Sequence, residues 1–394
     1  MAKSLTDNNP KLFFWAKFFG SFSFIAPVVT LFMLHRGLNY SDLLINLIFL
    51  VVAMFIFEVP TGMFADRFGP KASFIAGQLA FTISLTILIF ANNPLIFYLS
   101  WTIVGLGITF FSGADESFIY ESLKESKKEK QMSKVWAKIT SATFIPAIVG
   151  IIIGSILGKD LIEKQFVFLI LLTIISSAIP MFIFIFLKNP KVHIKSKEVG
   201  MFKHLNQGFK TIKSSPSLLF VFFHEILIFI PTYVFTEYSQ PLFVELGISV
   251  PTLGIILAVF SLVSFLLLRN LSRITDKISG IKLIYICDFI IFLGFAGLIF
   301  FTNSIIISLL AFYSIKLLGL IRSPIFSQIK NDYIPSGSRS TTLSLLSVID
   351  SAFDVIILLS LSLIADVGLN LIFIGCLFLV LIGLLFPIRI KVSS

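Results

Sequence analysis

Long apolar runs recur along the whole chain, and they constrain its fold more than any other feature. A bilayer has a hydrocarbon core about 30 Å thick, so a membrane-spanning helix needs about 20 apolar residues. Runs of that length predict twelve spans, but a count of eleven or thirteen stays open because one turn rests on residues 302–304 alone. The predicted spans lie at residues 11–34, 42–63, 72–91, 95–121, 135–158, 165–187, 216–238, 250–270, 281–302, 304–328, 340–366 and 368–387.

The composition supports a membrane protein with helical rather than barrel spans. Hydrophobic residues make up 57% of the chain and charged residues 13%, and the mean hydropathy is +0.99. Such a chain carries too much apolar surface for a water-soluble core. The runs are long and do not alternate, whereas barrel strands are short and alternate between polar and apolar residues. We therefore predict an all-α integral membrane protein.

The positive charge is concentrated on one side of the predicted spans. The net charge is +10, and 31 residues are Lys or Arg. With a cytoplasmic N-terminus, only Arg36, Lys159 and Lys164 face outward and Lys316 lies within a span, which leaves 27 on the cytoplasmic side. Because cytoplasmic loops retain Lys and Arg, both termini of this multi-pass chain are predicted to be cytoplasmic.

Several classes of function lack their usual sequence features. The basic runs at 124–134 and 187–204 are interpreted as charge at the inner leaflet of the cytoplasmic (inner) membrane, so no nucleic-acid partner is predicted. Cys287 and Cys376 lie within apolar runs, which predicts no disulfide. The sequence has no His-x-x-x-His pattern and no G-x-x-x-x-G-K-[ST] loop, so no metal, cofactor or ATP site is predicted. An enzyme is not predicted, and a membrane-embedded enzyme or a channel is kept only as an alternative of another class.

A short polar motif recurs at the same place in each half of the chain. The second and third spans are joined by GMFADRFG at 62–69, and the eighth and ninth by SRITDKIS at 272–279. Each has an Asp followed by a basic residue at its fifth and sixth positions. Internal repeats of this kind build many secondary transporters. The repeat predicts two pseudo-symmetric six-helix bundles, residues 1–187 and 216–394, joined by a cytoplasmic linker at 188–215.

These motifs resemble the major facilitator superfamily of secondary transporters. The stretch GMFADRFGPK is similar to the signature G-x-x-x-D-R-x-G-R-K between helices 2 and 3 of that family, with Pro70 where a basic residue is usual. The segments EVPTG, GADESFIYESL, YSQPLFVELGIS and IPSGSRSTTLSL are similar to its bacterial drug-efflux-like branch. In the fourth span, Trp101 stands where many proton-coupled antiporters of the family carry an arginine.

The resemblance implies the twelve-helix fold of the major facilitator superfamily and transport by alternating access. On this basis we expect a monomer in the lipid bilayer that moves a small organic, amphiphilic molecule by proton-coupled efflux. The missing arginine at Trp101 keeps an alternative open, which is an uptake symporter for a small metabolite coupled to H⁺ or Na⁺.

The polar cluster after the second span is predicted to be a latch at the cytoplasmic face. A glycine in the middle of the motif would permit close helix packing, and the glycine at its end would permit a tight turn. The resemblance implies that the aspartate meets the start of the eleventh span, while the basic residues would bridge to a carboxylate at the inner end of the fourth. The predicted latch residues are Glu58, Gly62, Asp66, Arg67, Gly69, Lys71, Glu121 and Arg339.

Ionisable residues inside the spans are the predicted substrate and proton-coupling site, because such residues are costly in a bilayer and mark function. Counting 1.5 Å per residue places Glu225, Lys316 and Asp350 near the midplane. Lys316 needs a carboxylate partner, and Asp350 is preferred over Asp354 and Glu225. Glu225 is the leading proton carrier, because its own span has no obvious basic neighbour.

Three further acidic residues are placed with less detail. Asp115 and Glu116 lie near the inner boundary of the fourth span, where a latch role through Arg67 is favoured over substrate contact. Asp288 is predicted to face the bundle interior, and the sequence indicates no partner for it. The predicted substrate and proton-coupling residues are Glu225, Lys316, Asp350, Asp354, Asp115 and Glu116.

Overall fold

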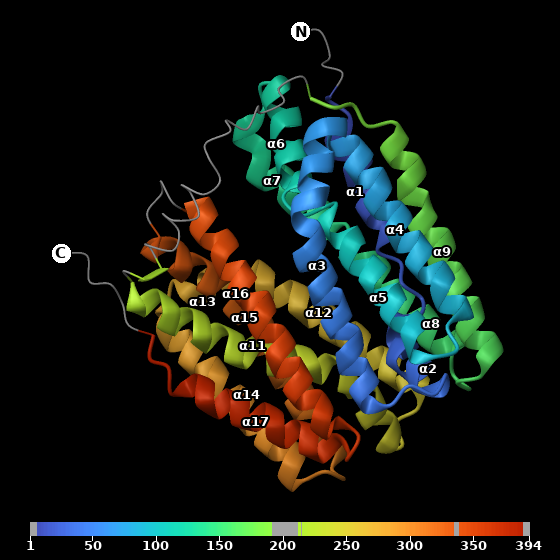
Figure 1. The fold of residues 1–394 in the computed structure, drawn as a ribbon, viewed down its shortest axis with the longest axis vertical. Coiled ribbons are helices and arrows are strands. Elements are labelled where there is room, and N and C mark those ends of the chain that lie inside the picture. The colour runs from blue at the N-terminus through green and yellow to red at the C-terminus, as the bar shows by residue number, and fades with distance from the viewer. Residues whose placement is uncertain (1–5, 191–211, 214, 335–338, 389–394) are drawn as a thin grey trace. The chain divides into compact units, whose positions relative to one another are not determined.

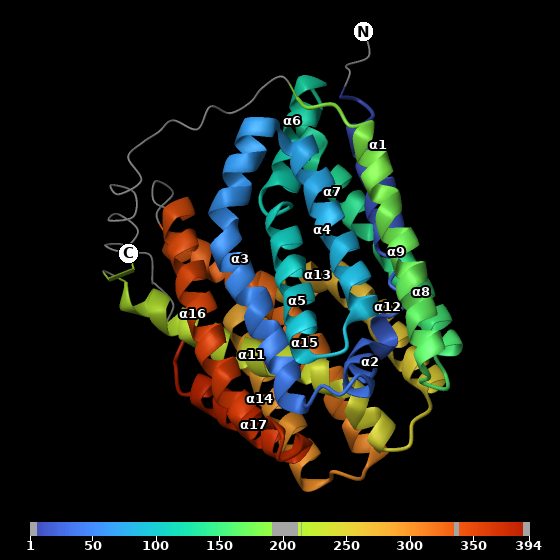
Figure 2. The same ribbon diagram turned by 45° about the vertical axis from the view of Figure 1, so that its right-hand side comes forward.

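The helices of the structure follow the apolar runs of the sequence (Figures 1 and 2). In this computed structural model, ten helical segments within the described residues are long and apolar enough to cross a membrane, and Ala26–His35 and Leu369–Leu384 are shorter apolar helices. The prediction of an all-α membrane protein is confirmed. The structure describes residues 6–190, 212–213, 215–334 and 339–388.

The chain divides into two compact units. Unit 1 comprises Met1–Lys195 and Ser249–Ser261. Its helices are α1 (Asn9–Gly20), η1 (Ala26–Val28), α2 (Val29–His35), α3 (Tyr40–Phe68), α4 (Pro70–Phe90), α5 (Pro94–Thr109), α6 (Ala114–Glu125), η2 (Glu129–Gln131), α7 (Met132–Ser141), α8 (Phe144–Leu157) and α9 (Glu163–Ile185).

Unit 2 comprises Ser196–Ile248 and Leu262–Ser394, so that α12 (Val250–Arg269) is divided between the units. The predicted linker at 188–215 and the basic run at 187–204 fall mostly on residues 191–211 and 214, which lie outside the described part of the chain. The other helices of unit 2 are α11 (Pro216–Glu245), α13 (Leu271–Thr275), α14 (Gly280–Phe300), α15 (Ile305–Tyr333), α16 (Arg339–Ala365) and α17 (Leu369–Leu384).

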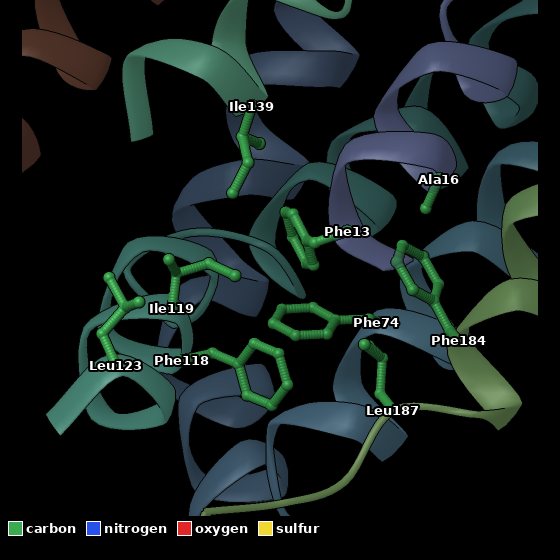
Figure 3. Close-up of a cluster of buried hydrophobic side chains, with 9 residues drawn as sticks. All are labelled: Phe13, Ala16, Phe74, Phe118, Ile119, Leu123, Ile139, Phe184 and Leu187. Carbon is green, nitrogen blue, oxygen red and sulfur yellow. The ribbon is translucent and has the colours of Figure 1, made fainter. Parts of the chain in front are cut away.

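Unit 1 is a bundle in which α4 packs against both α5 and α9 (Figures 1 and 2). Its core at one end is aromatic. In Figure 3 the ring of Phe74 lies among the other buried side chains, with its centroid 5.2 Å from that of Phe13 and 5.3 Å from that of Phe118. Both contacts are edge-to-face, a geometry that contributes about 0.5–1.5 kcal/mol per pair beyond the burial of apolar area. The cluster joins α1, α4 and α6.

The first predicted span, 11–34, is not one continuous helix. Helix α1 ends at Gly20, and the chain resumes as η1 and α2 after a non-helical stretch. The backbone N–H groups of Phe24 and Ile25 donate to the hydroxyl oxygen of Thr173 on α9, at 3.0 and 3.3 Å. Pro27 follows and has no N–H to donate. A side chain from another helix therefore replaces the missing helical hydrogen bonds.

Two other predicted spans are also interrupted. The span at 95–121 is formed by α5 and α6, with Gly113 between them at a φ of +65°, a left-handed conformation that glycine adopts at no steric cost. The span at 135–158 is formed by α7 and α8, which meet at residues 142–143.

Helix α8 lies unusually close to the chain that enters α2. A Cβ atom added at Gly154 would overlap the carbonyl oxygen of Phe24. We expect Gly154→Ala to lower the free energy of unfolding by about 1–3 kcal/mol, because the backbone on the other side has to move. Thermal unfolding of the purified protein measures the effect. Gly62→Ala is the matched control, because no atom lies within 4 Å of its Cβ position; equal losses in both variants would contradict the expectation.

Unit 2 is built around α11, the most buried of the candidate spans. Helix α11 packs against α15, α16 and α17, and α14 packs against α15 and α17. Together these contacts place one face of α11 toward α15 and another toward α17. The ionisable side chains of α11 can therefore reach α15, α16 and α17.

Candidate functional site

Three carboxylates and one lysine from α11, α15 and α16 of unit 2 form a chain of neighbouring charges. Glu225 on α11 forms an ion pair with Lys330 on α15, with 2.6 Å between Oε2 and Nζ. The charges of both residues act on Asp350 of α16, and the charge of Asp350 acts on Asp354. We call these four residues, Glu225, Lys330, Asp350 and Asp354, the acidic cluster.

Asp354 is the member of the acidic cluster whose polar atoms are least satisfied. It lies one helical turn beyond Asp350, and both side chains are half-buried. Its Oδ1 atom is buried and has no hydrogen-bond partner among the residues described. Leaving such an atom unsatisfied costs about 1–3 kcal/mol. A bound proton, or a donor group on a ligand, would remove that cost.

The surroundings of Glu225 include a basic group. The sequence indicates no basic neighbour within its own span, and the structure pairs Glu225 with Lys330 of another helix, α15. Lys330 lies at the end of α15 and was assigned to the cytoplasmic side by its position in the sequence. A lysine side chain can run back along its helix and place its charge deeper than its backbone. The pair therefore lies near the C-terminal end of α15, and its depth in the membrane stays a prediction.

The carboxylate whose charge acts on Lys316 is Glu237 of α11. The preferred pairing of Lys316 with Asp350 stays a prediction. The ammonium group of Lys316 also lies 5.2 Å from the centroid of the Phe312 ring. Glu237 is twelve residues beyond Glu225, so these two carboxylates of α11 lie in different layers of unit 2.

A third charged group in unit 2 is wholly buried, and sequence reasoning missed most of it. Asp288 on α14 contacts His224 on α11, with 2.7 Å between Oδ2 and Nε2, and Arg322 on α15, with 2.5 Å between Oδ1 and Nε. The side chains of Asp288 and His224 are 0% exposed and that of Arg322 is 3% exposed. We call these residues the buried triad. Arg322 had been counted with the cytoplasmic charge, although its place within the run 304–328 was a signal that it is inside.

Asp115 and Glu116 lie in unit 1, on the first turn of α6. Asp115 pairs with Lys17 of α1 at 3.4 Å. The favoured latch role through Arg67 stays a prediction. Glu116 is exposed. The ammonium of Lys17 also lies 5.4 Å from the centroid of the Phe111 ring.

Lys17 lines a cavity of about 480 Å³ within unit 1. The wall is mixed: aromatic rings of Phe22 and Phe81 face hydroxyl and amide groups such as those of Ser177 and Gln78. Gln78 is already engaged, since its Nε2 donates to both the carbonyl and the hydroxyl oxygen of Ser177, at 2.7 and 2.9 Å. The size and lining are typical of small-molecule sites.

The predicted latch is only partly assembled in this structure. Glu121 pairs with Lys124 on its own helix at 3.7 Å, which corrects the expected bridges to Arg67 and Lys71. The guanidinium of Arg67 lies over the Phe68 ring, 5.2 Å from its centroid, and Lys71 Nζ donates to the carbonyl oxygen of Ile185. The contacts are local. Glu121 and Lys124 are three residues apart and therefore neighbours on one helix face, and Arg67 contacts the residue that follows it in the chain.

The other latch residues occupy the ends of α3 and α4. Glu58 accepts a hydrogen bond from the hydroxyl of Ser112 at 2.7 Å, and Asp66 is exposed. Within the described residues no atom lies within 4 Å of the position a Cβ would take at Gly62, so close packing there stays a prediction, and Gly69 ends α3 at a φ of +86°. The side chain of Arg339 lies outside the described part of the chain, as does any contact that Asp66 makes with it.

The family model of the Major Facilitator Superfamily matches residues 14–356. The chain therefore belongs to this superfamily of membrane transporters. A search of the curated proteins finds no match to its sequence.

Solved transporter structures share the fold at low sequence identity. A mutant of the nucleoside transporter NupG has a TM-score of 0.79 at 13% identity, with 96% of this chain and 99% of that chain covered. A D-xylose-proton symporter has a TM-score of 0.73 at 12% identity, with 97% of each chain covered. A bacterial homologue of the human lysosomal transporter Spinster has a TM-score of 0.72 at 13% identity, with 98% of this chain and 97% of that chain covered.

Proposed function

We propose that this chain is a proton-driven exporter of small amphiphilic organic cations that works by alternating access. Membership of the superfamily and the similarity to solved transporters support membrane transport as the activity. The observation that carries the finer proposal is the acidic cluster of unit 2.

The charge of the acidic cluster favours exchange of a cation for protons. With all four groups ionised, three carboxylates and one ammonium leave a net charge of −2. A proton and an organic cation then compete for the same carboxylates. Once either has neutralised the negative charge, the other is attracted less strongly. Competition of this kind is what an antiporter needs, since one ligand has to leave before the other binds. An inward proton gradient then drives the cation out.

An uptake symporter is the second candidate. Its support is the fold shared with a D-xylose-proton symporter, together with Trp101 at the position where many antiporters of the family carry an arginine. In a symporter, proton and substrate bind together rather than in competition. The two candidates therefore differ in the sign of the coupling.

Proton flux in reconstituted vesicles tests the proposal. Substrates are first found with a panel of amphiphilic cations and size-matched anions, because a ligand that binds only the folded state raises its thermal midpoint. Vesicles are then loaded with a stabilising cation at equal pH on both sides. Exchange predicts that the lumen acidifies as the cation leaves. Alkalinisation of the lumen would establish symport instead, and stabilisation by the anions alone would remove the cation from the proposal.

A further inference from the structure

Both ring nitrogens of His224 face hydrogen-bond acceptors. Nδ1 lies 2.7 Å from the backbone carbonyl oxygen of Phe386, and Nε2 lies 2.7 Å from Oδ2 of Asp288. A carbonyl oxygen only accepts, so the proton of the first contact must be on Nδ1. The second contact then joins Nε2 to a carboxyl group, and it is a hydrogen bond only if one more proton lies between them.

The count of protons follows from these two contacts. A neutral imidazole has one N–H, which the Phe386 carbonyl uses, and an ionised carboxylate has none. A hydrogen bond between His224 and Asp288 therefore needs a second proton on the pair, in addition to the one on Nδ1. This second proton is favoured on the imidazole rather than on the carboxylate, because the guanidinium of Arg322, 2.5 Å from Oδ1, stabilises the ionised form of Asp288.

Arg322 pairs with Oδ1 of Asp288 and leaves Oδ2, the oxygen that faces His224, to the imidazole. Its Nε is close to Oδ1, but neither atom has a hydrogen-bond partner of acceptable geometry within the described residues, and Nη2 is also unsatisfied. The well-formed hydrogen bond of the Asp288 carboxylate is the one to His224. Removal of the shared proton would leave two acceptor atoms facing each other in a site closed to water, a costly arrangement.

The other ionisable groups around the triad do not replace this proton. On α14, Cys287 is buried and Tyr285 packs its ring edge-on to the imidazole, while its hydroxyl accepts from Ile388 N–H. On α11 and α15, Glu225 acts on Arg322 and is itself paired with Lys330. On α16, Asp350 and Asp354 belong to the acidic cluster, and α17 contributes Cys376.

We propose that the His224–Asp288 pair is a second, buried proton-binding site of this transporter, occupied in the present conformation and emptied when α11 and α14 separate. The occupied site links the two helices through one proton, with Arg322 connecting it to Glu225 of the acidic cluster. That the proton takes part in the transport cycle rests on the proposed function; that the site holds a proton does not.

Nitrogen-15 spectroscopy of labelled histidine tests occupancy without any transport assay. The chain has four His residues, so replacement of His35, His193 and His204 by Gln leaves His224 as the only signal. At pH 7.5, where an ordinary histidine is mostly neutral, we expect both nitrogens of His224 to carry protons. His35, which is half-exposed, is the reference signal in the unmodified protein. A His224 with an unprotonated Nε2 would overturn the proposal.

Transport by His224→Gln tests the role of the proton. Glutamine can donate to one acceptor but cannot bind and release a proton at neutral pH. In reconstituted vesicles we expect accumulation of a cation driven by a pH gradient to fall by at least about tenfold. Exchange of internal for external cation at equal pH should stay within about twofold of the wild type, and His35→Gln should change neither rate.

The outcomes separate the two proposals. Gradient-driven transport retained in His224→Gln would remove the site from the cycle. Absence of proton coupling in the wild type would instead remove the proposed function, and the spectrum would still decide whether the pair holds a proton. If His224→Gln does not fold, Asp288→Asn is used for the transport test. Gradient-driven transport retained in that variant would likewise remove the site from the transport cycle.

Discussion

Asp288→Ala is expected to lower the free energy of unfolding by about 3–5 kcal/mol, the usual cost of removing one partner from a buried ion pair. The carboxylate lies between His224 and Arg322, and all three side chains are buried. Without it, two cationic groups would face each other with no compensating charge and no water. Chemical denaturation of the purified protein, followed by a tryptophan or helix signal, measures the loss.

The matched control is Asp276→Ala, in the same unit. Asp276 is exposed at the end of α13, so its removal should change stability by less than about 0.5 kcal/mol. A loss at Asp288 as small as that of the control would mean that the triad is not ionised as described. Asp288→Asn should fall between the two, because it keeps the volume of the side chain but not its charge.

Glu225→Gln is expected to reduce proton-driven transport by at least about tenfold while the protein still folds. Glutamine keeps the shape of the side chain but cannot exchange a proton. The residues left behind are partly solvated, since Lys330 is 21% exposed, so the unpaired ammonium is tolerated. Accumulation of a fluorescent organic cation in vesicles with an imposed pH gradient measures the change.

Two further variants distinguish proton carrying from simple loss of an ion pair. Glu245→Gln removes an exposed carboxylate at the end of the same helix and should transport normally. Glu225→Gln combined with Lys330→Met removes the unpaired charge as well. We expect no recovery in the double variant, because the proton carrier is still absent. Recovery to the wild-type rate would show that the acidic cluster acts only as a structural ion pair.

The helical fold could be predicted from the sequence because the length of each apolar run is a local property. The interruption after Gly20 was not predicted, although Gly20, Ser21, Ser23 and Pro27 are residue types that favour a helix break. What stabilises the break is a hydroxyl on α9, almost 150 residues along the chain, which accepts the freed N–H groups. The local residues permit the break, but they do not identify this distant acceptor.

The buried charges were partly predictable, but their partners were not. A carboxylate inside an apolar run is visible in the sequence as an ionisable residue among hydrophobic ones, and Glu225, Asp350 and Asp354 were predicted in this way. Which residues meet depends on the rotation of each helix about its axis, and a rotation of one residue changes the partner. Glu225 meets Lys330, and Lys316 is influenced by Glu237, for this reason. Asp288 lacked a partner because His224 lies 64 residues away on another helix.

The contact between Thr173 and the break in the first span restricts how unit 1 can move. One hydroxyl oxygen serves two main-chain amides and donates in turn to the carbonyl of Leu169. Sliding α9 by a single turn would separate Thr173 from both amides, and they would then need a water molecule or another acceptor in the cavity that Ser23 and Thr173 line. We therefore expect α9 and the bent entry segment to move together, with bending confined to places where the backbone keeps its own hydrogen bonds.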